Sequence, residues 1–215
     1  MNFIVIFFGW IFSLCLHEFS HALAAYHGGD TTVREKGYLT FNPIKYAHPM
    51  LSLVIPVIIL LLGGIGLPGG AVYIETQRIR NRYWLSATSL AGPTANWVVA
   101  IVLGVLLNVL PASSYILPGI SFLLILQIWA VLINLIPIPQ LDGYGVIEPF
   151  LSPAIRMQMD RIRPFGVWAL LLALWYVPFI GDFFWNAIYV IASVFGVDWN
   201  LVVQGQNFLL NFFRM

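Results

Sequence analysis

Long apolar stretches separated by shorter polar ones run along most of the chain. Residues 3–27, 83–110 and 115–141 are apolar over most of their length, and each is long enough to cross a bilayer as a helix. The tail over 151–215 begins with a polar stretch and then becomes apolar and aromatic, with two interruptions by turn residues. We predict three transmembrane helices in the first part of the chain and one or two more helices in the tail.

The segment between the first two helices, residues 30–76, has a different pattern of polar and apolar residues. In 30–48 and 68–76, β-branched and aromatic residues lie among charged and polar ones, which predicts short strands at the membrane surface. Residues 49–67 are apolar but contain Pro56 and three glycines. Such a run fits either a plain transmembrane helix or a re-entrant segment that enters the membrane and returns.

Composition places the chain in a membrane. Of the 215 residues, 60% are hydrophobic and 9% are charged, whereas a soluble domain has about 25% charged residues. We therefore predict an all-α, multi-pass integral membrane protein in contact with the lipid bilayer. The net charge of +1 gives no basic surface for nucleic acid. The single cysteine, Cys15, excludes an internal disulfide and a zinc site built from paired cysteines.

The basic residues bear on the topology. They cluster after the first predicted span, before the second and after the third: Arg34, Lys36 and Lys45; Arg78, Arg80 and Arg82; Arg156, Arg161 and Arg163. If 49–67 spans the membrane, the first two clusters face opposite sides. If 49–67 is re-entrant, all three lie on one side, which the positive-inside rule makes cytoplasmic. The charges therefore favour a re-entrant segment.

The first apolar helix carries the motif His17-Glu18-Phe19-Ser20-His21. Positions i and i+4 lie on one face of a helix, so both imidazoles can reach one metal ion, and zinc accepts such ligands. Glu18 lies beside the pair, where it can take a proton from metal-bound water without binding the ion. Polar groups inside an apolar span cost free energy unless something binds them, which also indicates a metal site.

A catalytic zinc site normally has three protein ligands, so the third must come from another segment. The candidates outside obvious loops are Asp142, Glu148, Asp182, Asp198, His27 and His48. Asp142 is favoured because two prolines end the third apolar helix just before it and Gly143 lets the backbone turn behind it. The alternative is that Asp142 is an ordinary turn residue near the headgroups.

Four stretches together resemble a known family. HEFSH at 17–21, AGPTAN at 91–96 and NLIPIPQLDG at 134–143 are similar to the three signature motifs of the site-2 protease family of intramembrane zinc metalloproteases. GYLTFNPIKYAHP at 37–49 resembles the segment that follows HExxH in compact members without a PDZ domain. That segment often reads NPxxHxDP in relatives, whereas this chain has Tyr46 and His48 at the histidine and aspartate positions.

The resemblance implies a metalloprotease core over residues 1–150, in which three helices are joined by the small strands and the re-entrant segment. Residues 151–215 would form membrane segments outside this core. The active site of the family lies within the bilayer near the cytoplasmic face, and a bacterial or archaeal cell membrane is expected.

The resemblance also implies the residues of the site. One Zn²⁺ per chain would be bound by His17, His21 and Asp142, and Glu18 would be the catalytic carboxylate. For these ligands to meet, the first and third helices must run parallel, with an odd number of crossings between them. The helix over 83–110 supplies one crossing, so either 49–67 is re-entrant or Asp142 is not a ligand; we prefer the first.

Two asparagines are candidates for binding substrate. Asn134 matches the asparagine of the family's third motif, which lies near the substrate strand. Asn96 closes AGPTAN and can hydrogen-bond across the bundle. In both cases a contact with a neighbouring helix explains the polar side chain as well as a contact with substrate does.

We therefore predict a zinc metalloprotease that hydrolyses peptide bonds of transmembrane protein substrates, which would have to unwind locally and could pair with the predicted strands. The alternative is a zinc-bearing, non-proteolytic subunit of a larger membrane complex, which would meet its partner through the C-terminal segment. Glu18 argues against that alternative, since a scaffold has no use for a proton-transferring carboxylate. A transporter is disfavoured because the chain has no internal repeat.

Overall fold

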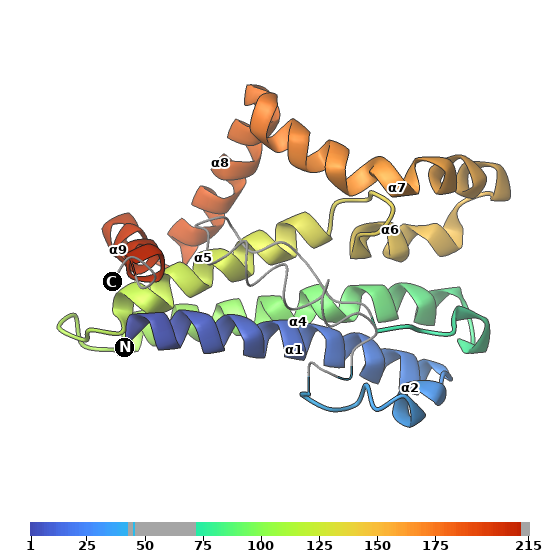
Figure 1. Cartoon of the computed structure of the whole chain (residues 1–215), viewed down its shortest axis with the longest axis horizontal. Coiled ribbons are helices and arrows are strands. Elements are labelled where there is room, and N and C mark those ends of the chain that lie inside the picture. The colour runs from blue at the N-terminus through green and yellow to red at the C-terminus, as the bar shows by residue number, and fades with distance from the viewer. Residues whose placement is uncertain (43–44, 46–71, 212–215) are drawn as a thin grey trace.

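The computed structural model describes residues 1–42, 45 and 72–211, and three long apolar helices form its centre. They are α1 (Asn2–Gly28), α4 (Arg82–Val109) and α5 (Leu117–Asn134). Each is long and apolar enough to cross a membrane. Figure 1 shows that α1 and α5 run in the same direction and that α4 returns in the opposite one. This is the parallel arrangement of the first and third helices that the predicted metal site requires.

Local chemistry sets the ends of these helices. The side chain of Asn81 caps α4 by accepting hydrogen bonds from the backbone amides of Tyr83 and Trp84, at 3.0 and 3.1 Å. The third helix, predicted over 115–141, ends earlier, at Asn134. Pro137 and Pro139 follow, and neither can donate the backbone hydrogen bond that would continue the helix.

Helix α5 is the centre of the bundle. In its apolar 18-residue stretch, 94% is buried, against 39% in the corresponding stretch of α1 and 33% in that of α4. Its wholly buried side chains include Leu124, Leu126 and Ile128. Because lipid is as apolar as leucine, close packing rather than the exclusion of water holds such a helix in a membrane. The outer faces of α1 and α4 are left to face lipid.

The part after α5 folds back over it. The short α6 (Asp142–Ile147) and the 3₁₀ turn η4 (Glu148–Phe150) lead into α7 (Pro153–Tyr176), α8 (Pro178–Val194) and α9 (Trp199–Asn211). Helices α7 and α8 meet at an angle of 90° and together are long and apolar enough for one broken span. Helices α8 and α9 pack on α5. The sequence predicts one or two helices here, and the described tail has three, because Pro178 and the turn at Gly196 divide it.

The predicted surface strands are wrong within the described residues. No strand occurs in 1–42, at 45 or in 72–211. The chain instead forms the short helix α2 (Thr32–Glu35), an irregular piece over 72–75 and the 3₁₀ turn η3 (Thr76–Arg78). One oxygen of Asp30 accepts hydrogen bonds from the amide and the hydroxyl of Thr32, at 3.1 and 2.6 Å, which turns the chain where a strand would continue.

The ends of the long connection between α1 and α4 lie together. The amide of Arg80 donates to the carbonyl of Gly28 at 2.9 Å, so α1 ends and α4 begins at the same end of the bundle. We call this closure the neck. The predicted re-entrant segment, residues 49–67, lies outside the described residues.

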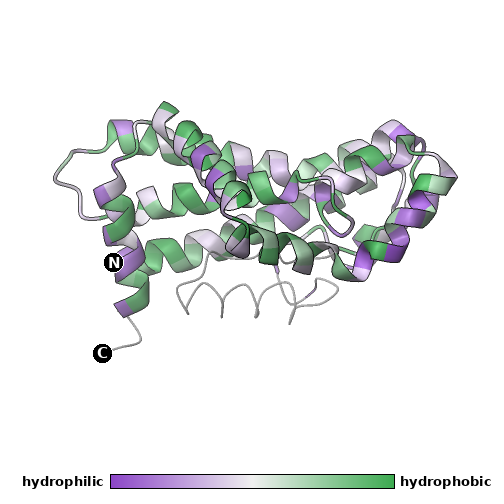
Figure 2. Ribbon diagram, turned by 90° about the horizontal axis from the view of Figure 1, so that it is seen from above, coloured by the Kyte–Doolittle hydropathy of each residue, from purple (hydrophilic) through white to green (hydrophobic). Residues whose placement is uncertain are grey.

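Polar residues concentrate where α7 begins. Figure 2 shows hydrophilic residues gathered at that end of the molecule, while apolar residues dominate the middle of the helices. Helix α2, the start of α4 and the start of α7 lie at this same end (Figure 1). The basic clusters on these three elements therefore share one end of the bundle.

Candidate metal centre and active site

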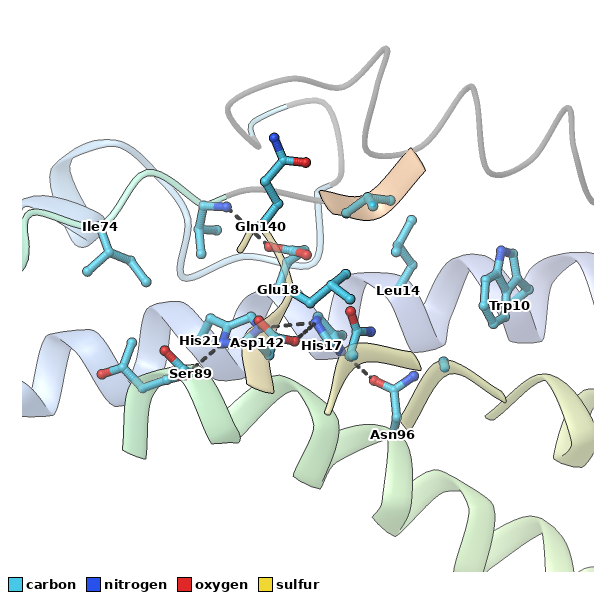
Figure 3. A pocket seen from close by; sticks show the side chains of 16 residues that line it. Trp10, Leu14, His17, Glu18, His21, Ile74, Ser89, Asn96, Gln140 and Asp142 are labelled. Carbon is cyan, nitrogen blue, oxygen red and sulfur yellow. Dashed lines mark hydrogen bonds and ion pairs between the residues drawn. The ribbon is translucent and has the colours of Figure 1, made fainter. Parts of the chain in front are cut away.

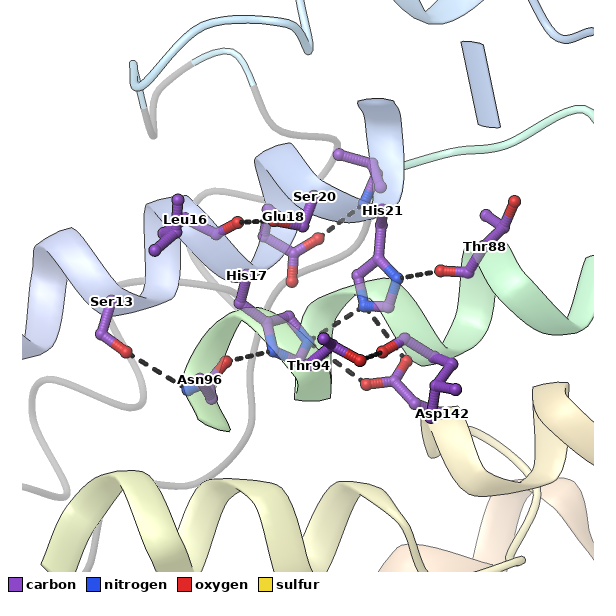
Figure 4. A network of polar contacts seen from close by, with 12 residues as sticks. Ser13, Leu16, His17, Glu18, Ser20, His21, Thr88, Thr94, Asn96 and Asp142 are labelled. Carbon is purple, nitrogen blue, oxygen red and sulfur yellow. Dashed lines mark hydrogen bonds and ion pairs between the residues drawn. The ribbon is translucent and has the colours of Figure 1, made fainter. Parts of the chain in front are cut away.

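Three candidate ligands meet between α1 and α6. The Nε2 atoms of His17 and His21 are 3.0 Å apart, and they lie 3.2 and 3.3 Å from the two carboxylate oxygens of Asp142. One ligand atom from each residue can be chosen so that all three lie within 4.8 Å of one another. Both histidines are buried and Asp142 is partly buried. Figure 4 shows the three side chains pointing toward a common centre.

The loop before α6 places Asp142 at this point. Gln140 has a φ of 85°, the only positive value among the non-glycine residues of the described chain, so the backbone reverses sharply just before the acid. Gly143 packs directly against the backbone of Leu135 and Ile136, and an added Cβ would lie 2.7 Å from the Ile136 carbonyl oxygen. Asp142 is brought back to α1 by the features of this loop: the two prolines, the positive φ of Gln140 and the close packing at Gly143.

The hydrogen bonds of the two imidazoles determine where their protons lie. His17 Nδ1 is 2.7 Å from Asn96 Oδ1, and His21 Nδ1 is 2.6 Å from the carbonyl oxygen of Thr88. Both partners are acceptors, so each neutral ring carries its proton on Nδ1 and presents the lone pair of Nε2 to the common centre.

This donor set fits a metal ion. Two imidazole lone pairs and a carboxylate face one point, and such acceptors can share that point only with a cation between them. The Oδ2 atom of Asp142 is buried and has no hydrogen-bond donor among the described residues. Two histidines and one acid are a ligand set that zinc uses in hydrolytic enzymes, in which a fourth position stays open.

Gly92 on α4 keeps this space open. A Cβ built on Gly92 would lie 2.6 Å from Nε2 of His17 and would overlap Nε2 of His21. Sequence reasoning names AGPTAN as a motif and discusses its asparagine, but it assigns no role to its glycine. The missed residue is Gly92, where any side chain would enter the space between the two Nε2 atoms.

Glu18 lies beside the metal centre in a cavity of about 390 Å³. Its carboxylate is buried, and Oε2 accepts a hydrogen bond of 3.1 Å from the backbone amide of Val72. Figure 3 shows Glu18 between the histidines and the piece of chain at 72–75. Sequence reasoning missed Val72, because its contact uses only the backbone and no side-chain type marks it.

The predicted asparagines are both at this site. Asn134 is buried and lines the cavity near the ligands. Asn96 lines the cavity as well, but its amide contacts His17, Ser13 and Gln127 (Figure 4 shows the first two). Ser13 and Gln127 are two further polar residues that sequence reasoning missed.

The other candidate ligands lie elsewhere. His27 lines a separate groove between α1 and α4, Glu148 is 3.9 Å from Arg163, and Asp198 accepts from the backbone amide of Asn200 at the start of α9. His48 lies outside the described residues. Within the described part of the chain, the group formed by His17, His21 and Asp142 is the only one able to hold a metal ion.

No protein-family model and no solved structure matches the chain. Curated relatives match along nearly all of it. The chain is 45% identical over 205 residues to a Mycolicibacterium smegmatis protein named "Putative zinc metalloprotease Rip2", covering 94% of this chain and 78% of that protein. A Mycobacterium tuberculosis protein of the same name is 40% identical over 212 residues, covering 95% and 79%.

A more distant relative extends the match beyond these organisms. A Bacillus subtilis protein named "Putative zinc metalloprotease YwhC" is 30% identical over 216 residues, covering 94% of this chain and 88% of that protein. The relatives carry names of the same protease family, and each match covers 94–95% of this chain. The chain therefore belongs to the site-2 protease family of zinc metalloproteases.

Proposed function

We propose that this protein is an intramembrane zinc endopeptidase that hydrolyses peptide bonds of transmembrane protein substrates. The observation that carries the proposal is the convergence of two Nε2 lone pairs and the Asp142 carboxylate on one point, with the carboxylate of Glu18 beside it in a cavity. The three helices that bring these groups together are each able to cross a membrane.

His17, His21 and Asp142 would hold one Zn²⁺ per chain. When bound, zinc lowers the pKa of a coordinated water toward about 7 and polarises a carbonyl oxygen. The protein contributes the geometry. Asn96 and the Thr88 carbonyl hold the two rings in the ligating tautomer, and Gly92 leaves the centre free of side-chain atoms.

Glu18 is the proposed general base and acid. Its carboxylate would take a proton from the attacking water and pass it to the amine of the departing peptide. The hydrogen bond from the Val72 amide fixes one oxygen of the carboxylate and leaves the other available. A fixed base is in place for proton transfer before the substrate arrives.

Asn134 is the proposed contact for the substrate backbone. It lines the same cavity as Glu18 and the ligands, and an amide side chain can both donate to and accept from an unwound peptide. The piece of chain at 72–75 also borders the cavity, and its backbone belongs to no helix or strand. A locally unwound substrate could therefore pair with it along the backbone.

The orientation in the membrane follows from charge. The elements that carry the basic clusters, α2, the start of α4 and the start of α7, lie at one end of the bundle (Figure 1). Helix α1 ends at this same end, and His17 and His21 lie in its second half. The positive-inside rule assigns this end to the cytoplasm. We therefore place the active site near the cytoplasmic face of a bacterial cell membrane.

The alternative function, a non-proteolytic zinc-bearing subunit, would use the C-terminal helices to meet a partner. Trp175, Tyr176 and Phe179 are each about four-fifths exposed where α7 meets α8. Lipid can cover aromatic side chains at this depth as well as a partner can. The two functions differ in whether Glu18 matters for catalysis.

The test compares the wild type with Glu18→Gln, both purified in detergent and reconstituted in lipid vesicles. Zinc content is measured by elemental analysis, and cleavage is measured with a fluorescent transmembrane peptide whose centre is rich in helix-breaking residues. Removal of the general base should reduce the cleavage rate by about 10²–10⁴-fold while zinc content stays at one per chain.

Glu148→Gln, which changes an acid outside the cavity, is the matched control and should cleave normally. Wild-type protein that holds zinc and cleaves no transmembrane peptide would support the accessory-subunit function. A Glu18→Gln variant that cleaves at the wild-type rate would remove Glu18 from the mechanism.

A further inference from the structure

A buried polar network joins the three central helices behind the metal centre. It consists of Ser13 on α1, Asn96 on α4 and Gln127 on α5, whose exposed fractions are 1%, 4% and 0%. Asn96 Nδ2 donates to Gln127 Oε1 at 3.0 Å and to Ser13 Oγ at 3.2 Å, and Ser13 Oγ donates to Gln127 Oε1. On its other side, Asn96 presents Oδ1 to Nδ1 of His17 at 2.7 Å.

The direction of these hydrogen bonds controls the proton of His17. An amide side chain has a donating and an accepting side, and the two sides of Asn96 point at different partners. As long as Gln127 accepts from Asn96 Nδ2, Asn96 Oδ1 must face His17, so Nδ1 carries the proton and Nε2 is free to bind a metal. If the amide of Asn96 turns over, Nδ2 donates to Nδ1 and the proton moves to Nε2, which then cannot be a ligand.

Ser13 cannot determine which way the Asn96 amide faces, because its hydroxyl can both donate and accept a hydrogen bond. Gln127 supplies the direction through the orientation of its amide, because Oε1 faces both Asn96 Nδ2 and Ser13 Oγ. Its Oε1 receives two hydrogen bonds, while its Nε2 is buried and has no partner among the described residues.

We propose that Gln127 is a positioning residue that holds His17 in the metal-binding tautomer through Asn96. This inference rests on the proposed metal site, and it assigns a role to a polar residue in the middle of the most buried helix. Gln127 touches neither the metal centre nor Glu18, so it acts only through Asn96.

The first measurement needs no metal. In metal-free protein labelled with ¹⁵N-histidine, the nitrogen chemical shifts report which ring nitrogen of His17 carries the proton, and a His17→Ala spectrum identifies the signal. The wild type should show His17 protonated on Nδ1. Gln127→Met, which keeps the length of the side chain and removes the acceptor, should show a mixture of both tautomers.

The second measurement is zinc affinity, obtained by competition with a chelator. Loss of an outer hydrogen-bond partner typically weakens metal binding by about tenfold or more, and we expect Gln127→Met to raise the Kd for zinc by about tenfold. The matched control is Ser121→Ala, which removes another buried polar group from α5 that has no partner among the described residues. It should leave both the tautomer and the Kd unchanged.

The decisive variant is Asn96→Asp. A carboxylate only accepts, so it keeps the proton on His17 Nδ1 whatever residue stands at 127. In this background Gln127→Met should no longer change the Kd. An equal change in both backgrounds, or an unchanged tautomer in Gln127→Met alone, overturns the proposal.

The test remains decisive if Gln127→Met does not fold or if the wild type binds no zinc. If Gln127→Met does not fold, Gln127→Glu retains the acceptor and must keep the wild-type tautomer and Kd; a mixed tautomer or a raised Kd there overturns the proposal. If the wild type binds no zinc, the proposed metal site fails, while the tautomers of the metal-free variants still decide the role of Gln127.

Discussion

At the scale of single residues, the metal centre depends on a position that carries no side chain. Gly92 faces the Nε2 atoms of both histidines, and an added methyl group would occupy the space between them. The neighbouring backbone belongs to a long helix held by α1 and α5 on its sides, so it cannot move away cheaply. The site is therefore sensitive to the smallest possible enlargement.

Gly92→Ala should weaken zinc binding by at least about tenfold, comparable to the loss of a group that orients a ligand. The helix content should not change, because alanine favours helices more than glycine does. Thr94→Ala on an exposed face of the same helix is the control and should bind zinc like the wild type. Zinc affinity by chelator competition and circular dichroism check both statements; normal binding by Gly92→Ala would contradict the role given to Gly92.

At the scale of elements, the irregular piece at 72–75 connects the surface of the protein to Glu18. Asp30, which is fully buried, accepts a hydrogen bond of 2.7 Å from the amide of Glu75. The Glu75 carboxylate contacts Lys36 at 3.0 Å and Arg78 at 2.6 Å. These cations lower the pKa of Glu75 below its ordinary value, so its two ion pairs are complete at neutral pH and are lost as the pH falls through the lowered pKa.

The hydrogen bond from the Val72 amide to Glu18 predicts that a change of the backbone affects catalysis. Val72→Pro removes the amide that donates to Glu18, and the cleavage rate should fall by about tenfold or more because the general base is no longer held. Zinc content should stay at the wild-type level, since the ligands lie on α1 and α6. Val72→Ala keeps the amide and should cleave nearly normally. Equal rates for the proline and alanine variants would show that the amide is not needed.

At the scale of the whole molecule, the proposed ligands come from two helices that are far apart in the sequence. His17 and His21 lie in α1, and Asp142 begins α6 after the α5 helix has crossed the bundle. An ion bound between them links the first helix to the loop after the third. Binding should therefore stabilise the folded bundle as well as equip it for chemistry.

Removal of zinc should lower the midpoint of thermal unfolding. A ligand present at about 100 times its Kd contributes about 2.7 kcal/mol, which corresponds to a shift of roughly 5–10 °C for a chain of this size. Circular dichroism in detergent, with a chelator and then with zinc restored, measures it. Asp142→Asn should respond to neither treatment; a full shift in that variant would show that the ion binds elsewhere.

The sequence predicted the three central helices well, because long apolar runs are a local signal. The HExxH spacing and the family resemblance predicted His17, His21 and Asp142 as a set, and the structure brings these three side chains together. The predicted strands are absent from the part of the chain that the structure describes, where Asp30 turns the chain locally through its contacts with Thr32 and Glu75. Gln127 was missed for a different reason. A single polar residue in an apolar run acquires meaning only when its neighbours on two other helices are known.

The neck between Gly28 and Arg80 has a consequence for how such proteins diversify. The described parts of the stretch between these residues remain in contact with the bundle: Val33 and Tyr38 pack with residues of α1, and the Val72 amide reaches Glu18. Because the hydrogen bond of the neck ties the end of α1 directly to the chain before α4, an insertion elsewhere in the stretch need not separate these two helices. A change that moves Val72, in contrast, would reach the proposed general base.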